Sequence, residues 1–191
     1  MPKNEAMYYE AQEGYINCRL CPHHCRLKEG QTGLCRVRTN CAGVLRAANF
    51  GQISSIAIDP IEKKPLFHFH PGKNILSVGT YGCNFHCLFC QNYAIAHYSP
   101  QLHYIEPDTL VDIAIKAQEE GSIGIAFTYN EPSIWYEYIF AVAPLLKNKG
   151  LKVVIVTNGY IEEKPLRSLL PFIDAVNVDV KSFNEDFYRK I

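Results

Sequence analysis

The sequence lacks a charge imbalance and a long apolar run. Its 191 residues include 19 basic and 19 acidic side chains, so no net field favours nucleic acid or an anionic membrane surface. No stretch approaches the roughly 18 consecutive apolar residues that indicate a membrane span. We therefore expect no nucleic-acid partner and no membrane partner.

The sequence also lacks an export signal at its start, because residues 1–14 are polar and contain no apolar stretch. Eight cysteines in such a chain indicate metal ligands rather than disulfides, and a reducing cytoplasm is the expected location. Apolar residues make up 48% of the chain, which is enough for the core of one ordinary domain with a small appendage.

What the chain does have is a group of three cysteines, Cys83, Cys87 and Cys90, within eight residues. Thiolates are soft ligands that select iron–sulfur clusters, zinc or copper(I). Three cysteines on one loop can hold three irons of a cubane cluster and leave the fourth iron open to a small molecule. A zinc site with His86 as a local fourth ligand is the alternative.

A second group of cysteines lies in residues 15–50, which are short on helical periodicity. Its members are Cys18, Cys21, Cys25 and Cys35. Four thiolates at this spacing suit a tetrahedral zinc site or a second iron–sulfur cluster, and His23 or His24 could replace one thiol. Some of these thiols could instead be buried small residues. Cys41 is expected to be a free thiol.

The rest of the chain alternates strands with helices. Continuous apolar runs predict strands at 75–79, 123–128, 153–157 and 175–180. Periodicity and bounding Pro and Gly residues predict helices at 110–120, 134–149 and 164–170 and another from 184. Such alternation predicts an α/β fold with a parallel sheet and right-handed crossovers.

We divide the chain into four segments on this basis. Residues 1–14 are interpreted as a frayed or weakly helical lead and residues 15–50 as a small Cys-rich metal-binding module. Residues 51–73 are interpreted as a hairpin-like connection, with 44–50 and 53–58 as the arms on either side of Gly51-Gln52. Residues 74–191 form the α/β core.

Polar side chains stand at or after the last three predicted strands, where parallel folds place their ligands. These candidate residues are Asn130, Glu131, Thr157, Asn158, Asp179 and Lys181. Structural alternatives remain open for each strand end. Glu131-Pro132 also suits the start of a helix, and Asn158-Gly159 suits a turn.

Together these motifs resemble the radical S-adenosylmethionine (SAM) enzymes of the AmmeMemoRadiSam system, which are similar to the pyruvate formate-lyase activating enzymes. The resemblance is carried by Cys18-x2-Cys21-Pro22-x2-Cys25 with Gly30, Gly33 and Cys35, and by residues 59–66, 82–92 and 128–132. The chain departs from the family pattern where Tyr129 and Asn130 replace a Gly-Gly pair.

The resemblance implies a [4Fe-4S] cluster on Cys83, Cys87 and Cys90, with SAM on the open iron and its ammonium group received by Glu131 and nearby backbone carbonyls. A one-electron donor such as flavodoxin or ferredoxin would reduce the cluster. Reductive cleavage of SAM would then give a 5′-deoxyadenosyl radical that takes hydrogen from a glycine of a partner protein or from a small molecule. No protein acid or base is demanded, so we expect no catalytic side chain.

The resemblance also implies an open barrel of six βα units. Only the first four are found here, which predicts a partial barrel and a truncated core. Two other functions suit the same residues: an iron–sulfur electron-transfer or metal-binding module without SAM chemistry, and a zinc-dependent interaction protein built on the N-terminal cysteines.

Overall fold

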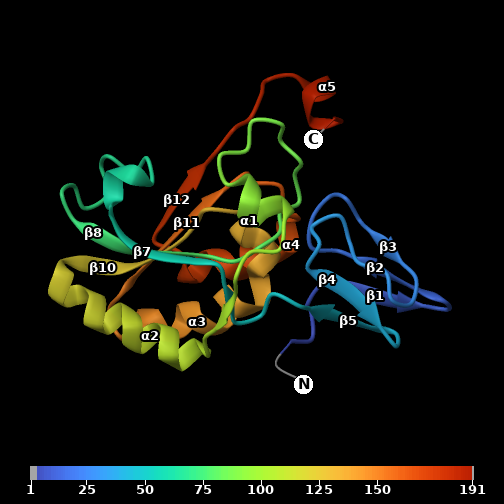
Figure 1. Ribbon diagram of the computed structural model, residues 1–191, viewed down its shortest axis with the longest axis horizontal. Coiled ribbons are helices and arrows are strands. Elements are labelled where there is room, and N and C mark those ends of the chain that lie inside the picture. The colour runs from blue at the N-terminus through green and yellow to red at the C-terminus, as the bar shows by residue number, and fades with distance from the viewer. Residues whose placement is uncertain (1–3, 191) are drawn as a thin grey trace.

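The computed structural model describes residues 4–190, and a five-stranded sheet forms its centre (Figure 1). Across the sheet the strands are β12 (Ala175–Val178), β11 (Lys152–Thr157), β10 (Ser122–Phe127), β8 (Asn74–Gly79) and β7 (Ser55–Pro60). The first four are parallel to one another, and β7 pairs antiparallel with β8. The four predicted strands and the α/β class are confirmed. The open barrel stays a prediction.

Helices connect the parallel strands, as the sequence pattern predicted. They are α2 (Pro107–Lys116), α3 (Tyr136–Asn148) and α4 (Glu163–Leu169), each continued or preceded by a short 3-10 turn. Short helix α1 (Tyr93–His97) follows the cysteine loop, and α5 (Glu185–Tyr188) lies within the segment predicted to be helical from 184. Among the described helices, none combines the length and apolarity that crossing a bilayer requires.

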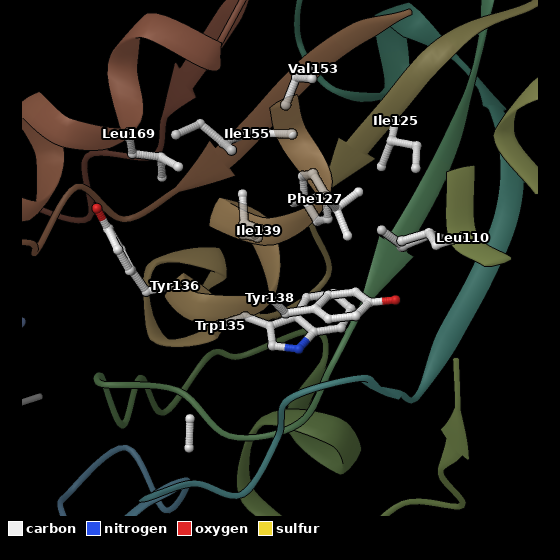
Figure 2. Close-up of a cluster of buried hydrophobic side chains, with 14 of the residues drawn as sticks. Leu110, Ile125, Phe127, Trp135, Tyr136, Tyr138, Ile139, Val153, Ile155 and Leu169 are labelled. Atoms are coloured by element: carbon white, nitrogen blue, oxygen red, sulfur yellow. The ribbon is translucent and has the colours of Figure 1, made fainter. Parts of the chain in front are cut away.

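The main core lies between the sheet and helices α2 and α3 (Figure 2). Trp135 stacks on Tyr138 with ring centroids 4.7 Å apart, and both side chains are fully buried. Their polar tips are satisfied, because Trp135 Nε1 donates to the Asn49 carbonyl and the Tyr138 hydroxyl donates to the Ile105 carbonyl. Buried Tyr and Trp rings usually need such partners.

The N-terminal part is built from short antiparallel strands. A three-stranded sheet contains β1 (Tyr9–Gln12), β2 (Tyr15–Cys18) and β3 (Arg26–Leu27), and β4 (Arg38–Cys41) forms a hairpin with β5 (Val44–Ala47). The lead predicted at 1–14 is therefore wrong where β1 pairs with β2, since that segment is extended. Residues 1–3 of the lead lie outside the described residues.

The hairpin predicted between residues 44–50 and 53–58 is also wrong. β5 pairs with β4, the strand before it in the chain. β6 (Gln52–Ile53) pairs with β9 (His103–Tyr104), and β7 joins the main sheet. The β4–β5 turn has positive φ at Ala42 and Gly43, 52° and 78°, as a type I′ hairpin turn requires. By pairing with β8, strand β7 supplies hydrogen-bond partners to the edge of the parallel sheet. The local alternation of residues in β7 does not predict such a distant partner.

Gly124 on β10 lies very close to the backbone of the neighbouring strand β11. The β10–β8 register shifts between Ser122 and Ile125, and Gly124 there has a φ of +157°. An added β-carbon would lie 2.0 Å from the Lys152 carbonyl oxygen. No other residue type fits this position without moving a strand.

We expect Gly124→Ala to lower the free energy of unfolding by about 3 kcal/mol, the upper part of the range for overpacked cores. Gly14→Ala is the control, since Gly14 has a φ of +79° but no atom within 4 Å of an added β-carbon; backbone strain alone costs about 1 kcal/mol there. Urea unfolding measures both variants. Equal losses would contradict the close approach.

Candidate functional site

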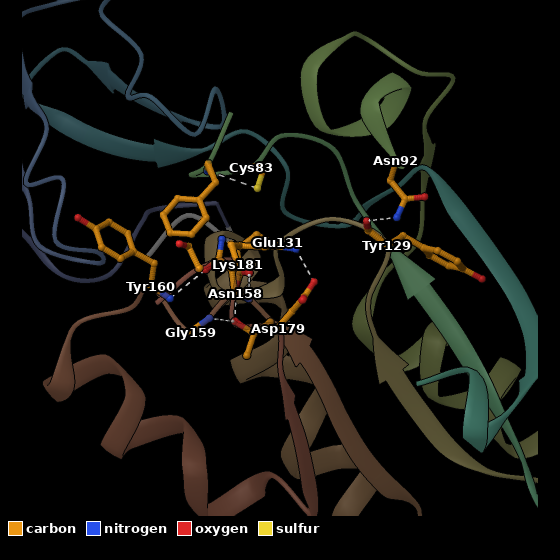
Figure 3. A network of polar contacts seen from close by, with 12 residues as sticks. Cys83, Asn92, Tyr129, Glu131, Asn158, Gly159, Tyr160, Asp179 and Lys181 are labelled. Carbon is orange, nitrogen blue, oxygen red and sulfur yellow. Dashed lines mark hydrogen bonds and ion pairs between the residues drawn. The ribbon is translucent and has the colours of Figure 1, made fainter. Parts of the chain in front are cut away.

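The carboxyl ends of the parallel strands surround a cavity of about 400 Å³, within the usual range for small-molecule sites. All nine residues predicted for the cluster loop and the strand ends line it: Cys83, Cys87, Cys90, Asn130, Glu131, Thr157, Asn158, Asp179 and Lys181. Several of them are shown in Figure 3. The parallel arrangement brings together residues that are almost 100 positions apart in the sequence.

Glu131 ties two strand ends together. Its Oε1 accepts hydrogen bonds from the Thr157 hydroxyl, at 2.6 Å, and from the Ser133 backbone N–H, at 2.9 Å. Its Oε2 accepts from the Asn158 backbone N–H at 2.7 Å. Burial raises the pKa of Glu131, although these donors act in the opposite direction. The carboxylate therefore both lines the cavity and holds the loop after β11.

Asn84 ties the cysteine loop to the same strand end, and it was not among the predicted site residues. This buried side chain donates from Nδ2 to the Tyr160 carbonyl and accepts at Oδ1 from Asn158 Nδ2, both at 2.9 Å. Its signal in the sequence is a polar residue between ligand cysteines. Its partners could not be found from the sequence, because they lie more than 70 residues away.

The Tyr129-Asn130 pair contains one residue, Tyr129, in a backbone conformation that glycine adopts most readily. Tyr129 has a φ of +73°, in the left-handed region that favours glycine. Asn130 accepts from the Thr80 N–H and donates to the Gly82 carbonyl, so its amide braces the start of the cysteine loop. Both substitutions are thus accommodated by specific contacts.

The Tyr129 side chain is held by a cluster beneath the cavity. Its hydroxyl donates to Asp59 Oδ2 at 3.0 Å, and the Lys64 ammonium donates to the same oxygen at 2.8 Å. Lys63 contacts Oδ1 at 2.7 Å. Burial works to raise the pKa of Asp59, but the two lysines outweigh it and hold the pKa well below its usual range. Asp59, Lys63 and Lys64, which are close together in the sequence, thus form one charged cluster beside the Tyr129 hydroxyl.

Asp179 and Lys181 line the same cavity as the thiols and form an ion pair. The Lys181 ammonium is also 6.0 Å from the centre of the Phe89 ring on the cysteine loop. Burial lowers the pKa of Lys181, but Asp179 and the nearby thiols raise it overall. Lys181 thus places a positive charge beside the cluster loop.

The thiols of the cysteine loop suit a cubane better than a single metal ion. His86, the local fourth ligand that a zinc ion would take here, stacks on His97 and is not among the residues that line this cavity. A cubane binds each thiolate through a different iron, so its ligands stay apart. Burial raises the pKa of Cys83 to about 12, so a metal must displace the proton there.

The four N-terminal cysteines, Cys18, Cys21, Cys25 and Cys35, line a separate and much smaller cavity. Cys41 is exposed and lies outside both cavities. The four cysteines that the sequence analysis grouped together thus lie around one cavity.

Residues 77–191 match the Radical SAM superfamily. Because the match covers more than half of the chain, the protein belongs to this superfamily. Members of it use a [4Fe-4S] cluster and SAM, and the cavity offers ligands of the appropriate kind for both.

Three proteins of Methanocaldococcus jannaschii are similar to this chain. The chain is 44% identical over 191 residues to the uncharacterized protein MJ0808, a match covering 98% of the chain and 56% of the relative. It is 21% identical over 121 residues to 7-carboxy-7-deazaguanine synthase, covering 58% of the chain and 48% of that enzyme. The uncharacterized protein MJ0674 is 25% identical over 183 residues, covering 92% and 48%. The chain thus spans about half the length of these relatives.

We expect Asp59→Asn to lower the free energy of unfolding at pH 7 by about 3 kcal/mol, as for other broken buried ion pairs. A carboxyl whose pKa is lowered by folding stabilises the protein above its unfolded pKa, about 4, and loses that contribution as the pH falls below it. Urea unfolding from pH 7 down to about pH 3 should therefore show a shallower acid loss in the variant. Exposed Asp112→Asn is the control, and an unchanged acid slope in Asp59→Asn would contradict the assignment.

We expect Glu131→Gln to lower the free energy of unfolding by about 2 kcal/mol, because an amide NH2 replaces one acceptor oxygen in a buried site. The Asn158 amide should also exchange its hydrogen faster, since it donates to Glu131 Oε2. Hydrogen exchange and urea unfolding measure the two effects. Exposed Glu163→Gln on α4 is the control, and unchanged protection of the Asn158 amide would show that Glu131 does not hold this loop.

Proposed function

We propose that this chain holds a [4Fe-4S] cluster on Cys83, Cys87 and Cys90 and cleaves SAM in the cavity at the strand ends. The observation that carries the proposal is the joint location of the three thiols and the six polar strand-end residues on one cavity. If each of these residues had only a structural role, the nine side chains would not need to line the same cavity.

The reduced cluster and SAM supply the radical chemistry, and the chain supplies binding and orientation. The buried Glu131 carboxylate is fixed by its donors and provides the negative charge that an ammonium group requires. Lys181, which lines the same cavity, provides a positive charge for a carboxylate. Thr157 and Asn158 bond to Glu131 and so hold the loop after β11 at the cavity.

The electron donor is proposed to be a small protein such as flavodoxin or ferredoxin. Leu88 and Phe89, between the second and third cysteines, are 102% and 57% exposed. The cluster loop thus reaches the surface, where a donor protein can approach it closely.

We propose membership of the AmmeMemoRadiSam system, with a chemistry similar to glycyl-radical activation, on the motifs at 18–35 and 59–66. The hydrogen donor would be a glycine α-carbon of a partner protein or a small molecule. The similarity to 7-carboxy-7-deazaguanine synthase, a relative named for a small-molecule product, supports the second substrate class.

We expect the anaerobically reconstituted and reduced protein to release 5′-deoxyadenosine and methionine from added SAM. Cys87→Ala should reduce the yield to background, because one cluster ligand is lost. Cys41→Ala is the matched control, since this exposed thiol lies outside the cavity, and its yield should equal that of the unmodified chain. Liquid chromatography of the quenched reaction measures both products.

Two outcomes would overturn the proposal. A reducible iron–sulfur cluster that leaves SAM intact would favour an electron-transfer module. Equal product from the Cys87→Ala and Cys41→Ala proteins would show that the cysteine loop does not hold the reactive cluster.

A further inference from the structure

The N-terminal cysteines enclose a space that the SAM chemistry does not use. Its lining contains all four thiols, from Cys18 at the end of β2 and from the loops that carry Cys21, Cys25 and Cys35. Three of these thiols belong to buried residues, and Cys25 is partly buried. Four soft ligands around one closed space are typical of a structural metal site.

The size of this space distinguishes between the metals that four thiols could hold. The cavity measures about 10 Å³, which is roughly the space that one water molecule needs. A cubane cluster consists of four irons and four sulfides and requires a larger rearrangement of the surrounding side chains than a single ion does. A single ion fits, and zinc is the ion for which four thiolates form a closed tetrahedral site.

Backbone N–H groups already point at the sulfur atoms. The backbone N–H groups of His23 and Val37, each two residues after a cysteine, donate to the sulfurs of Cys21 and Cys35. Cys83 on the cluster loop receives the same kind of bond from the Phe85 N–H. Such bonds stabilise a thiolate that binds a metal.

Arg38 supplies a positive charge at the same cavity. Its side chain is buried and lines the space, and its Nε and Nη1 have no hydrogen-bond partner. Its Nη2 contacts Glu137 Oε1 at 3.0 Å. A buried guanidinium with free donors favours a negatively charged neighbour, which four neutral thiols do not provide.

We propose that Cys18, Cys21, Cys25 and Cys35 bind one zinc ion. Each thiol would release a proton to solvent as its zinc–sulfur bond forms, which leaves a site of net charge −2 beside Arg38. In this structure the sulfurs do not yet converge on one point, so binding requires side-chain rotations. Cys21, Cys25 and Cys35 lie outside strands, where such movement is easiest.

The segment around Cys21 also contacts residues that hold the SAM cavity in shape. His23 Nε2 donates to the Asn84 carbonyl at 2.7 Å, and the Glu162 N–H donates to the Leu20 carbonyl at 2.9 Å. The rings of His23 and Tyr160 lie 5.0 Å apart. The proposed ion therefore stabilises the loop that positions Asn84, without itself contacting the cavity.

The test uses the protein with Cys83, Cys87 and Cys90 all replaced by Ser, so that no cluster can form on that loop and the result is independent of SAM cleavage. We expect this protein to contain about one zinc per chain by mass spectrometry of the metals. Adding Cys18→Ser and Cys35→Ser should abolish the zinc, whereas adding Cys41→Ser should leave it unchanged, because Cys41 is exposed and outside the site.

A second measurement uses the triple-Ser protein alone, so it does not depend on whether the further variants at Cys18 and Cys35 fold. The triple-Ser protein is stripped with a chelator and loaded with Co²⁺, and we expect the intense visible absorption of tetrahedral cobalt thiolate, reversed by zinc. Iron and sulfide in place of zinc would overturn the proposal in favour of a second cluster. Neither zinc nor the cobalt spectrum would show that these cysteines do not bind a metal.

Discussion

The buried carboxylate of Glu131 is the constraint on which the site depends. Parallel strands bring their carboxyl ends to one edge of the sheet, but they do not set how the following loops lie. Glu131 receives donors from Ser133, Thr157 and Asn158, and Asn158 in turn contacts Asn84 on the cysteine loop. One buried charge thus connects three strand ends into a single wall.

The departure from the Gly-Gly pair shows how a strained backbone is supported from outside the cavity. Tyr129 keeps the positive φ of a glycine, at a cost of about 1–3 kcal/mol for such a residue. Its hydroxyl is held by Asp59, which also binds Lys63 and Lys64. The charged motif on β7 and its following turn therefore belongs to the same structural unit as the residues after β10.

Sequence patterns found the elements whose signal is local. The apolar runs of β8, β10, β11 and β12 are continuous because both faces of a parallel strand are covered. The same reasoning failed at residues 44–58, where alternation predicted a hairpin but β5 and β7 pair with different strands. It also missed Asn84, since the need for its amide arises only from the position of Asn158 and Tyr160.

The sequence by itself determined the ligand types, their spacing on the cysteine loop, the α/β class and the strand ends that carry polar groups. These depend on chemical identity and on short-range periodicity. The tertiary structure alone decided that nine such residues line one cavity, that Asp59 supports Tyr129, and that four N-terminal cysteines line one small space. Those facts depend on contacts between distant segments, which strand register and the packing of the core create.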